Sequence, residues 1–313
     1  MAVSSFALCT LGQVRQFLQL TAASAVRDGL IEREIERVAQ EVESYTRRLF
    51  VGRDHLEYLD GSGDSEQRLT HRPLISLGSL NDDINRVWAG TDTIDKANVQ
   101  LLKGQGRLRL WDKEGGFGLG FQNVRVEYFA GYAIVDINWG ANKIDFKEHA
   151  AGTQYTAIIP PGEHDVVSLA SHVMREMNAT AGLNTYHATF DTKSRKYTVT
   201  MATGGTGTLQ LLWNSGANTT ESLGLALGFS TSADLTGATS YTPATNVLPR
   251  IPRDIEQAAI EIVSERYDRS PYGQDRLGIR SESIGDYSVT FFGTPIPEHV
   301  SLTLERYKKH QIS

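Results

Sequence analysis

Apolar residues recur at alternating steps of three and four along two stretches of the chain, the spacing that places them on one face of an α-helix. Charged residues fill most of the other positions in both stretches. We therefore expect two amphipathic helices that pack lengthwise on each other, with their ionic sides left for solvent or for neighbouring subunits. The stripe in residues 26–50 is Ile31, Ile35, Val38, Val42, Tyr45 and Leu49, and the stripe in residues 250–267 is Ile255, Ala259, Ile262, Val263 and Tyr267.

Capping signals predict where the helices begin and end. Thr10 and Gln13 have the spacing of a capping box and predict a short helix before residue 20. Pro252 is compatible with the first turn of the second amphipathic helix, where the N–H that proline lacks is not needed. A last helix is expected over residues 297–309, because its final turn carries cations that suit a helix carboxyl end, namely Arg306, Lys308 and Lys309.

Between these helices, from His55 onward, the apolar period changes to two, which is typical of strands that bury one face. Glycine turns separate the alternating runs, and neither of the two turns "DGSGD" and "KGQGR" precedes a helix as a phosphate-binding loop would. We expect a small antiparallel β region, with strands near residues 79–87, 99–102, 107–111 and 123–130.

Residues 135–247 differ in composition from the rest, with more Thr, Ala, Gly and Asn and fewer basic residues. Their order, β-β-α-β-β-β-α, can close a separate core, so we interpret them as an inserted α+β accessory domain that ends in a glycine-punctuated linker, residues 230–249. The predicted fold class is α+β: a helical core of long amphipathic helices with a small antiparallel β region, plus the inserted α+β module. The helices and small β region, residues 1–134 and 248–313, form one discontinuous domain in this interpretation.

Charge and cysteine content narrow the possible classes of function. The net charge of −6 and the pI near 5.8 disfavour tight binding to nucleic acid, and no apolar run approaches the roughly twenty residues that span a bilayer. Cys9 is the only cysteine, so no disulfide can form within the chain, which favours folding in a reducing cytoplasm. We interpret Cys9 as a small buried apolar residue.

No catalytic or metal-binding pattern emerges from the remaining polar residues. The eight histidines are scattered without the further ligands of a zinc site, and "ATGGTGTL" lacks the lysine of a P-loop. Ser281 and Ser283 have no G-x-S-x-G context, and the adjacent Asp82 and Asp83 would point to opposite faces of a strand. The sequence therefore predicts no enzyme, no cofactor and no metal.

Several segments, taken in order, resemble the head-tail connector, or adaptor, family of tailed bacteriophages. The similar segments cover residues 7–133 and 248–307. One feature departs from the family pattern. In that pattern "AGY" is followed within a few residues by "IP", whereas here more than a hundred residues lie between them. The segments that carry the resemblance are "LCTLGQVRQFL", "LIEREIERVAQEVESYTRRLF", "EYLDGSGDSEQRLTHRPLISLGSL", "NVRVEYFAGYA", "IPRDIEQAAIEIVSERYDR" and "SESIGDYSVTF".

The resemblance implies a structural virion protein made in the host cytoplasm and located at the head-tail interface, or neck. Its implied partners are eleven further copies in a dodecameric ring, the portal protein above it, and a stopper or tail-completion protein below. Genomic DNA would pass through the channel without sequence-specific binding, and no membrane is involved. By analogy, the basic carboxyl end would dock on the portal, through Tyr307, Lys308, Lys309 and His310.

An alternative function is that of a virion-associated carbohydrate-binding or hydrolytic protein that uses the inserted domain. Several outward-facing copies would give such a domain avidity even if each site were weak. Sugars stack on clusters of exposed aromatic rings, and the insert has only two tryptophans, Trp139 and Trp213. This composition favours a decorating or stabilising role for the insert.

Overall fold

The computed structural model describes residues 6–21, 24–111, 116–149, 151–180, 184–202, 207–268, 281–284, 287–290 and 296–308. The chain divides into two compact units, and each is described by itself. Residues 1–51 and 251–313 form the helical unit, and residues 52–250 form the strand-rich unit. The chain therefore enters and leaves the strand-rich unit between the two long amphipathic helices.

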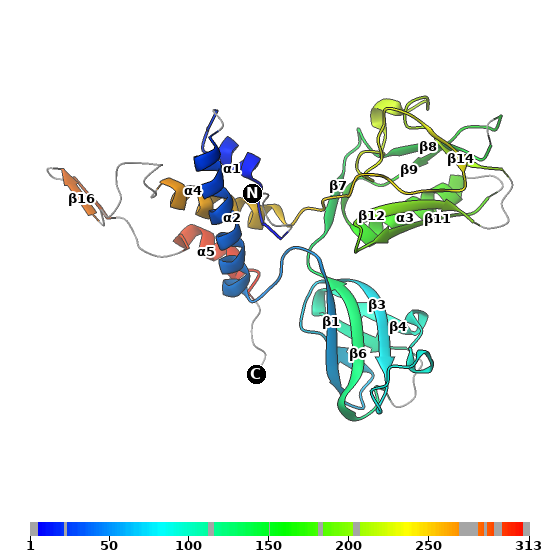
Figure 1. The fold of residues 1–313 in the computed structure, drawn as a ribbon, viewed down its shortest axis with the longest axis horizontal. Helices are drawn as coiled ribbons and strands as arrows, with labels where there is room; N and C mark the ends of the chain where they lie inside the picture. The colour runs from blue at the N-terminus through cyan, green and yellow to red at the C-terminus, as the bar shows by residue number, and fades with distance from the viewer. Residues whose placement is uncertain are drawn as a thin grey trace. The chain divides into compact units, whose positions relative to one another are not determined.

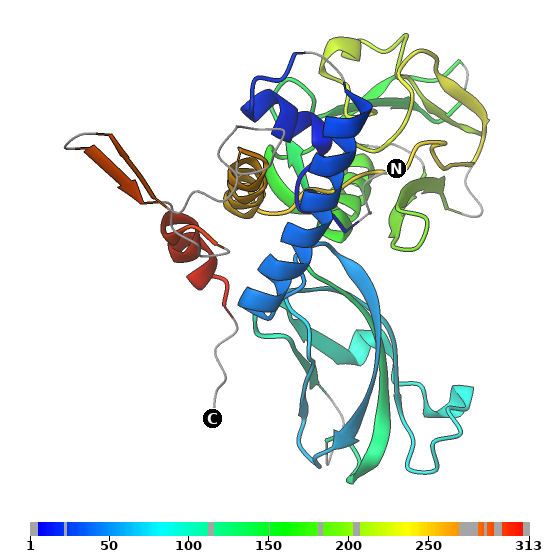
Figure 2. The ribbon, with the colours of Figure 1, turned by 60° about the vertical axis from the view of Figure 1, so that its left-hand side comes forward.

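The helical unit contains α1 (Leu11–Phe17), α2 (Ala25–Thr46), α4 (Arg253–Asp268) and α5 (Glu298–Glu305). Helices α1, α2 and α5 all contact α4, and the views in Figures 1 and 2 show α2 as the longest of them. The capping box at Thr10 is formed, with its hydroxyl accepting the N–H of Gln13. Helix α2 ends at Thr46 because Arg47 takes a left-handed conformation with φ of 54°.

The same unit carries a hairpin of two short strands, β16 (Ser281–Ile284) and β17 (Tyr287–Thr290). The two strands are antiparallel, with Ser281 opposite Thr290 and Ile284 opposite Tyr287. They form a two-stranded sheet with no further strand among the described residues.

The first part of the strand-rich unit has two three-stranded antiparallel sheets, β1-β6-β3 and β2-β5-β4. Their inward residues, including Leu80, Leu108, Phe117 and Val126, form one hydrophobic cluster. The strands are β1 (Arg53–Gly61), β2 (Glu66–Arg68), β3 (Leu74–Asp82), β4 (Val99–Leu102), β5 (Arg107–Leu110) and β6 (Gly120–Ala130), and short 3-10 turns lie at η1 (Gly90–Asp92), η2 (Lys96–Asn98) and η3 (Lys103–Gln105).

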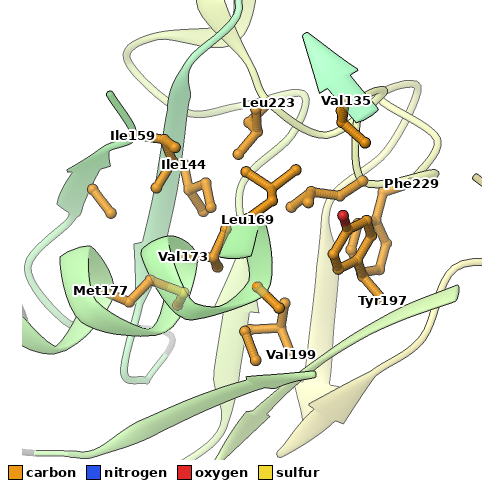
Figure 3. Packing of buried hydrophobic residues seen from close by; sticks show 14 of the residues in the cluster. Val135, Ile144, Ile159, Leu169, Val173, Met177, Tyr197, Val199, Leu223 and Phe229 are labelled. Atoms are coloured by element: carbon orange, nitrogen blue, oxygen red, sulfur yellow. The ribbon is translucent and has the colours of Figure 1, made fainter. Parts of the chain in front are cut away.

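The second part of this unit surrounds α3 (Val166–Thr180), whose apolar face lies in a second hydrophobic cluster. Figure 3 shows Leu169, Val173 and Met177 of this helix among side chains from the neighbouring strands. The sheets are β14-β13-β8-β9, β11-β12-β15 and β10-β7. Their strands are β7 (Ile134–Ile137), β8 (Lys143–Lys147), β9 (Tyr155–Ile158), β10 (Gly162–Asp165), β11 (Tyr186–Asp191), β12 (Lys196–Met201), β13 (Leu209–Leu211), β14 (Leu235–Ala238) and β15 (Ser240–Tyr241), with one 3-10 turn at η4 (Thr219–Glu221).

The predicted fold class is wrong in its main statement, because a helical core with only a small β region does not describe the chain. More of the described residues lie in strands than in α-helices. The physical reason is that residues 53–130 bury their own cluster between two sheets and do not need the helices as a core. In addition, the predicted exit linker contains β14 and β15, which extend the sheets of β13 and β12.

Candidate functional site

Helices α2 and α4 are joined by an ion-pair network as well as by apolar contact. The guanidinium of Arg266 on α4 pairs with the carboxylates of Glu41 and Glu34 on α2, the latter at 3.6 Å. Glu41 also accepts a hydrogen bond from Arg37 Nε at 3.1 Å. Burial would raise the pKa of Glu41, but the hydrogen bonds and charges of the two arginines outweigh burial and hold that pKa below its ordinary value.

The apolar stripes of these two helices are for the most part buried within the helical unit. Only Tyr45 and Leu49 of the predicted set are half-buried, and Leu49 lies beyond the end of α2 because the helix stops at Thr46. The buried members of the predicted set are Ile31, Ile35, Val38, Val42, Ile255, Ala259, Ile262, Val263 and Tyr267.

The carboxyl end of the helical unit is tied down at two of the four residues predicted to dock on the portal. The hydroxyl of Tyr307 donates to the carboxylate of Asp254, with both oxygens at 2.8 Å, and its ring meets that of Phe50 edge-on at 5.6 Å between centroids. Lys308 lies over the ring of Tyr45, 4.6 Å from its centroid. These two side chains therefore serve the fold of the unit.

The other two predicted docking residues, Lys309 and His310, lie outside the described residues. Lys308 also donates to Glu305, at 2.8 Å, and this hydrogen bond raises the pKa of the lysine. Tyr45 donates to the same Glu305 at 2.6 Å, and that hydrogen bond raises the pKa of the tyrosine. Glu305 thus links Tyr45, near the end of α2, to Lys308, the last described residue.

The two ends of residues 135–249 meet in a pair of backbone hydrogen bonds. The N–H of Ile134 donates to the carbonyl of Arg250 at 2.9 Å, and the N–H of Arg250 donates to the carbonyl of Ile134 at 2.8 Å. The guanidinium of Arg250 pairs with Asp136 and Glu163, and the hydrogen bond that it donates to Asp136 raises the pKa of the arginine. The chain therefore leaves residues 135–249 next to the point where it entered them.

In the described ranges, the His, Cys, Asp and Glu side chains form no group of three or more that could hold a metal ion. Cys9 is buried, and burial, followed by the nearby charge of Glu256, raises the pKa of its thiol to about 12. A thiol of this kind is not a nucleophile at neutral pH. Of the two tryptophans in residues 135–247, Trp213 is 1% exposed inside the core and only Trp139 is exposed, so the two rings do not form a platform for a sugar.

The structure brings together two pairs of histidines that the sequence leaves apart. The rings of His55 and His71 stack at 4.1 Å between centroids, and those of His164 and His172 meet edge-on at 4.8 Å. Burial, followed by the charge of His71, lowers the pKa of His55 to about 4. No spacing rule predicts the first pair, because the chain turns through β2 between its members.

Comparison with known proteins gives a partial structural likeness. A chain in the virion of a native gene transfer agent particle is 20% identical, over 42% of this chain and 69% of that chain, with a TM-score of 0.31. A chain in the neck of the empty particle is 22% identical, with the same coverage and TM-score. No family model and no curated protein matches. The chain is thus similar in part to virion and neck proteins of this particle, at a level that does not establish a shared fold.

Among the helices in the described ranges, none combines the length and the apolar character needed to cross a bilayer.

Proposed function

We propose that the chain is a structural virion protein of the neck, in which twelve copies form a ring between the portal and the stopper or tail. DNA would pass through the channel of this ring. The proposal combines the ordered resemblance to head-tail connectors with one structural observation, the backbone pairing of Ile134 with Arg250. The resemblance requires residues 133 and 250 to be near neighbours, and this pairing brings them together.

The proposal treats residues 135–247 as an accessory domain carried by the ring subunit. Their hydrophobic cluster is largely their own, with Ile75 and Phe129 as the contributions from the preceding strands. A domain that closes its own core and returns the chain to its starting point can be inserted without altering the subunit that carries it. We expect it to decorate or stabilise the neck.

The physical character of the helical unit supports assembly with other copies. The stripes of α2 and α4 are buried within the unit, and exposed positions on α2, such as Arg33 and Gln40, can contact neighbouring subunits. The negative net charge of the chain suits a channel through which DNA must move, because tight binding of phosphates would slow its passage.

Deletion of the insert tests the proposal directly. Residues 135–249 are replaced by Asn-Gly, which closes a two-residue hairpin turn between the paired Ile134 and Arg250. Ile75 and Phe129 are changed to threonine, since the deletion would expose them. Electron microscopy of the full chain and of the variant, each with and without portal, should show twelvefold rings in both. Full-length protein that binds no portal and forms no ring in either condition would refute the proposed function.

Portal docking by the carboxyl end is tested by two truncations. Truncation after Lys308 removes only residues 309–313 and should abolish portal binding with the fold intact. Truncation after Arg306 also removes the contacts of Tyr307 with Asp254 and Phe50, so it should destabilise the helical unit and is the less informative variant. Portal binding that survives the first truncation would exclude this docking segment.

A further inference from the structure

A further inference rests on the proposed ring and begins with an unpaired strand edge. Strand β1 is an outer strand of its sheet, and its ladder partners all lie on β6, from Arg53 opposite Ala130 to Gly61 opposite Gly120. Within the described ranges no strand pairs with the other edge of β1. A nine-residue edge of this kind is a template on which another strand can add.

The middle of β1 is apolar on its exposed side. Leu56 and Tyr58 are 50% and 46% exposed, and the ring of Tyr58 lies 5.5 Å from that of Trp88 between centroids. The charged residues on this side, Asp54 and Asp60, lie near the ends of the strand. The only irregularity of the ladder, a bulge, is also near its end, after Leu59. The central positions thus lack a lysine, a proline or a bulge, and their one charged residue, Glu57, is half-buried and accepts hydrogen bonds from the Tyr128 hydroxyl and the Thr70 N–H within the same subunit.

The hairpin of β16 and β17 is a candidate partner for the free edge of β1. An isolated two-stranded hairpin is at best marginally stable in water, and a third strand or a packing surface stabilises it. The chain supplies no third strand for it among the described residues. Each of its strands is four residues long, which matches the stretch of β1 from Leu56 to Leu59, where Leu56 and Tyr58 are exposed and Glu57 is half-buried.

We propose that β17 of one subunit pairs with the free edge of β1 in the neighbouring subunit. Tyr287 and Val289 occupy alternate register positions of β17, so one or the other can stand opposite Tyr58 in the new sheet. Strand β16 offers Glu282 at the matching position and is the poorer partner. Each subunit gives one hairpin and accepts one, which is the head-to-tail contact that a closed ring repeats.

Cysteine cross-linking tests the pairing in the full chain. The background variant is Cys9→Ala, and Tyr58→Cys is combined with Val289→Cys or, for the other register, with Tyr287→Cys. Two single-site variants mixed under mild oxidation should give a reducible dimer, and the double variant should give a ladder of covalent oligomers. The matched control replaces Tyr58→Cys by Trp139→Cys, at a position that is 77% exposed in the insert, and should give no dimer.

An assembly measurement complements the cross-links. Tyr58→Asp should raise the protein concentration needed for half-maximal ring formation by about tenfold or more, because an unpaired charge would enter the new sheet. Trp139→Asp should leave that concentration unchanged. Two results together would overturn the pairing and leave the proposed neck function standing. They are normal ring formation by Tyr58→Asp and the absence of any cross-link between Tyr58→Cys and the cysteines in the hairpin. A cross-link formed only within single chains would also overturn it. If the full chain forms no ring with or without portal, the proposed function and the pairing are both refuted.

Discussion

Two arginines share the carboxylate of Glu41, and they provide a matched pair of perturbations of the contact between α2 and α4. The side chain of Arg266 is 15% exposed and comes from the other helix, whereas that of Arg37 is 65% exposed and comes from the same helix. Arg266→Met and Arg37→Met each remove one guanidinium and keep most of the apolar stem. The two variants therefore compare a half-buried interhelical pair with an exposed intrahelical one.

The expected magnitudes differ because solvent screens the two pairs differently. An exposed ion pair contributes about 0–1 kcal/mol, so Arg37→Met should have little effect. A hydrogen bond between charged groups contributes roughly 1.5–3 kcal/mol when shielded. Glu41 is 30% exposed, so we expect about 1–2 kcal/mol for Arg266→Met, or a factor of about 5 to 30 in the opening equilibrium of the helices.

The assay is hydrogen exchange of the α2 and α4 amides, followed by mass spectrometry. The four tryptophans of the chain, Trp88, Trp111, Trp139 and Trp213, all belong to the strand-rich unit, so their fluorescence reports whether that unit is unaffected. The effect of Arg266→Met should shrink as the pH falls. The pKa of Glu41 is lowered in the folded state, so its contribution is complete above the unfolded pKa and is lost as the pH falls through the folded pKa. Equal exchange in the two variants at neutral pH would refute the packing of α2 on α4 through Arg266.

Three further predictions concern packing, backbone and protonation. Leu169→Ala, in the core around α3, should destabilise the strand-rich unit by about 2–5 kcal/mol in urea titrations followed by tryptophan fluorescence, while Leu225→Ala at a 72% exposed position should have almost no effect. Gly29→Ala should stabilise α2 by about 0.5–1 kcal/mol, measured as slower hydrogen exchange, because an added Cβ meets nothing within 4 Å; faster exchange would contradict this. The lowered pKa of His55 means that the folded state resists protonation, so stability should fall as the pH drops from about 6.5 toward 4. In His55→Phe this acid sensitivity should be weaker, and an unchanged pH profile would contradict it.

The helices could be predicted from sequence because a 3.6-residue period and capping residues are local signals. The capping box at Thr10 and the helix that begins next to Pro252 both have their cause within a few residues. The apolar stripe predicts a helix over residues 26–50, but α2 ends at Thr46, because Arg47 takes the left-handed conformation that glycine or asparagine usually adopts at a helix end.

The extent of β structure was underestimated because strand pairing is a long-range property. Strands β14 and β15 lie in a stretch rich in Thr, Gly and Ser that has the composition of a linker, and only their partners β13 and β12 make them strands. The contacts of Tyr307 were missed for a similar reason, since its partner Asp254 lies 53 positions away in the chain. The pattern around Tyr307 shows a basic helix end and gives no sign that the phenol is engaged.

The base of residues 135–249 is closed by backbone pairing. Arg250 and Ile134 exchange both backbone hydrogen bonds, so the chain is closed at the base of residues 135–249 in the way that a hairpin turn would close it. The ion pairs of Arg250 with Asp136 and Glu163, both within residues 135–249, stabilise the same closure. Because the backbone groups at the base are paired, the strands before it and α4 after it have the same local requirements with or without residues 135–249.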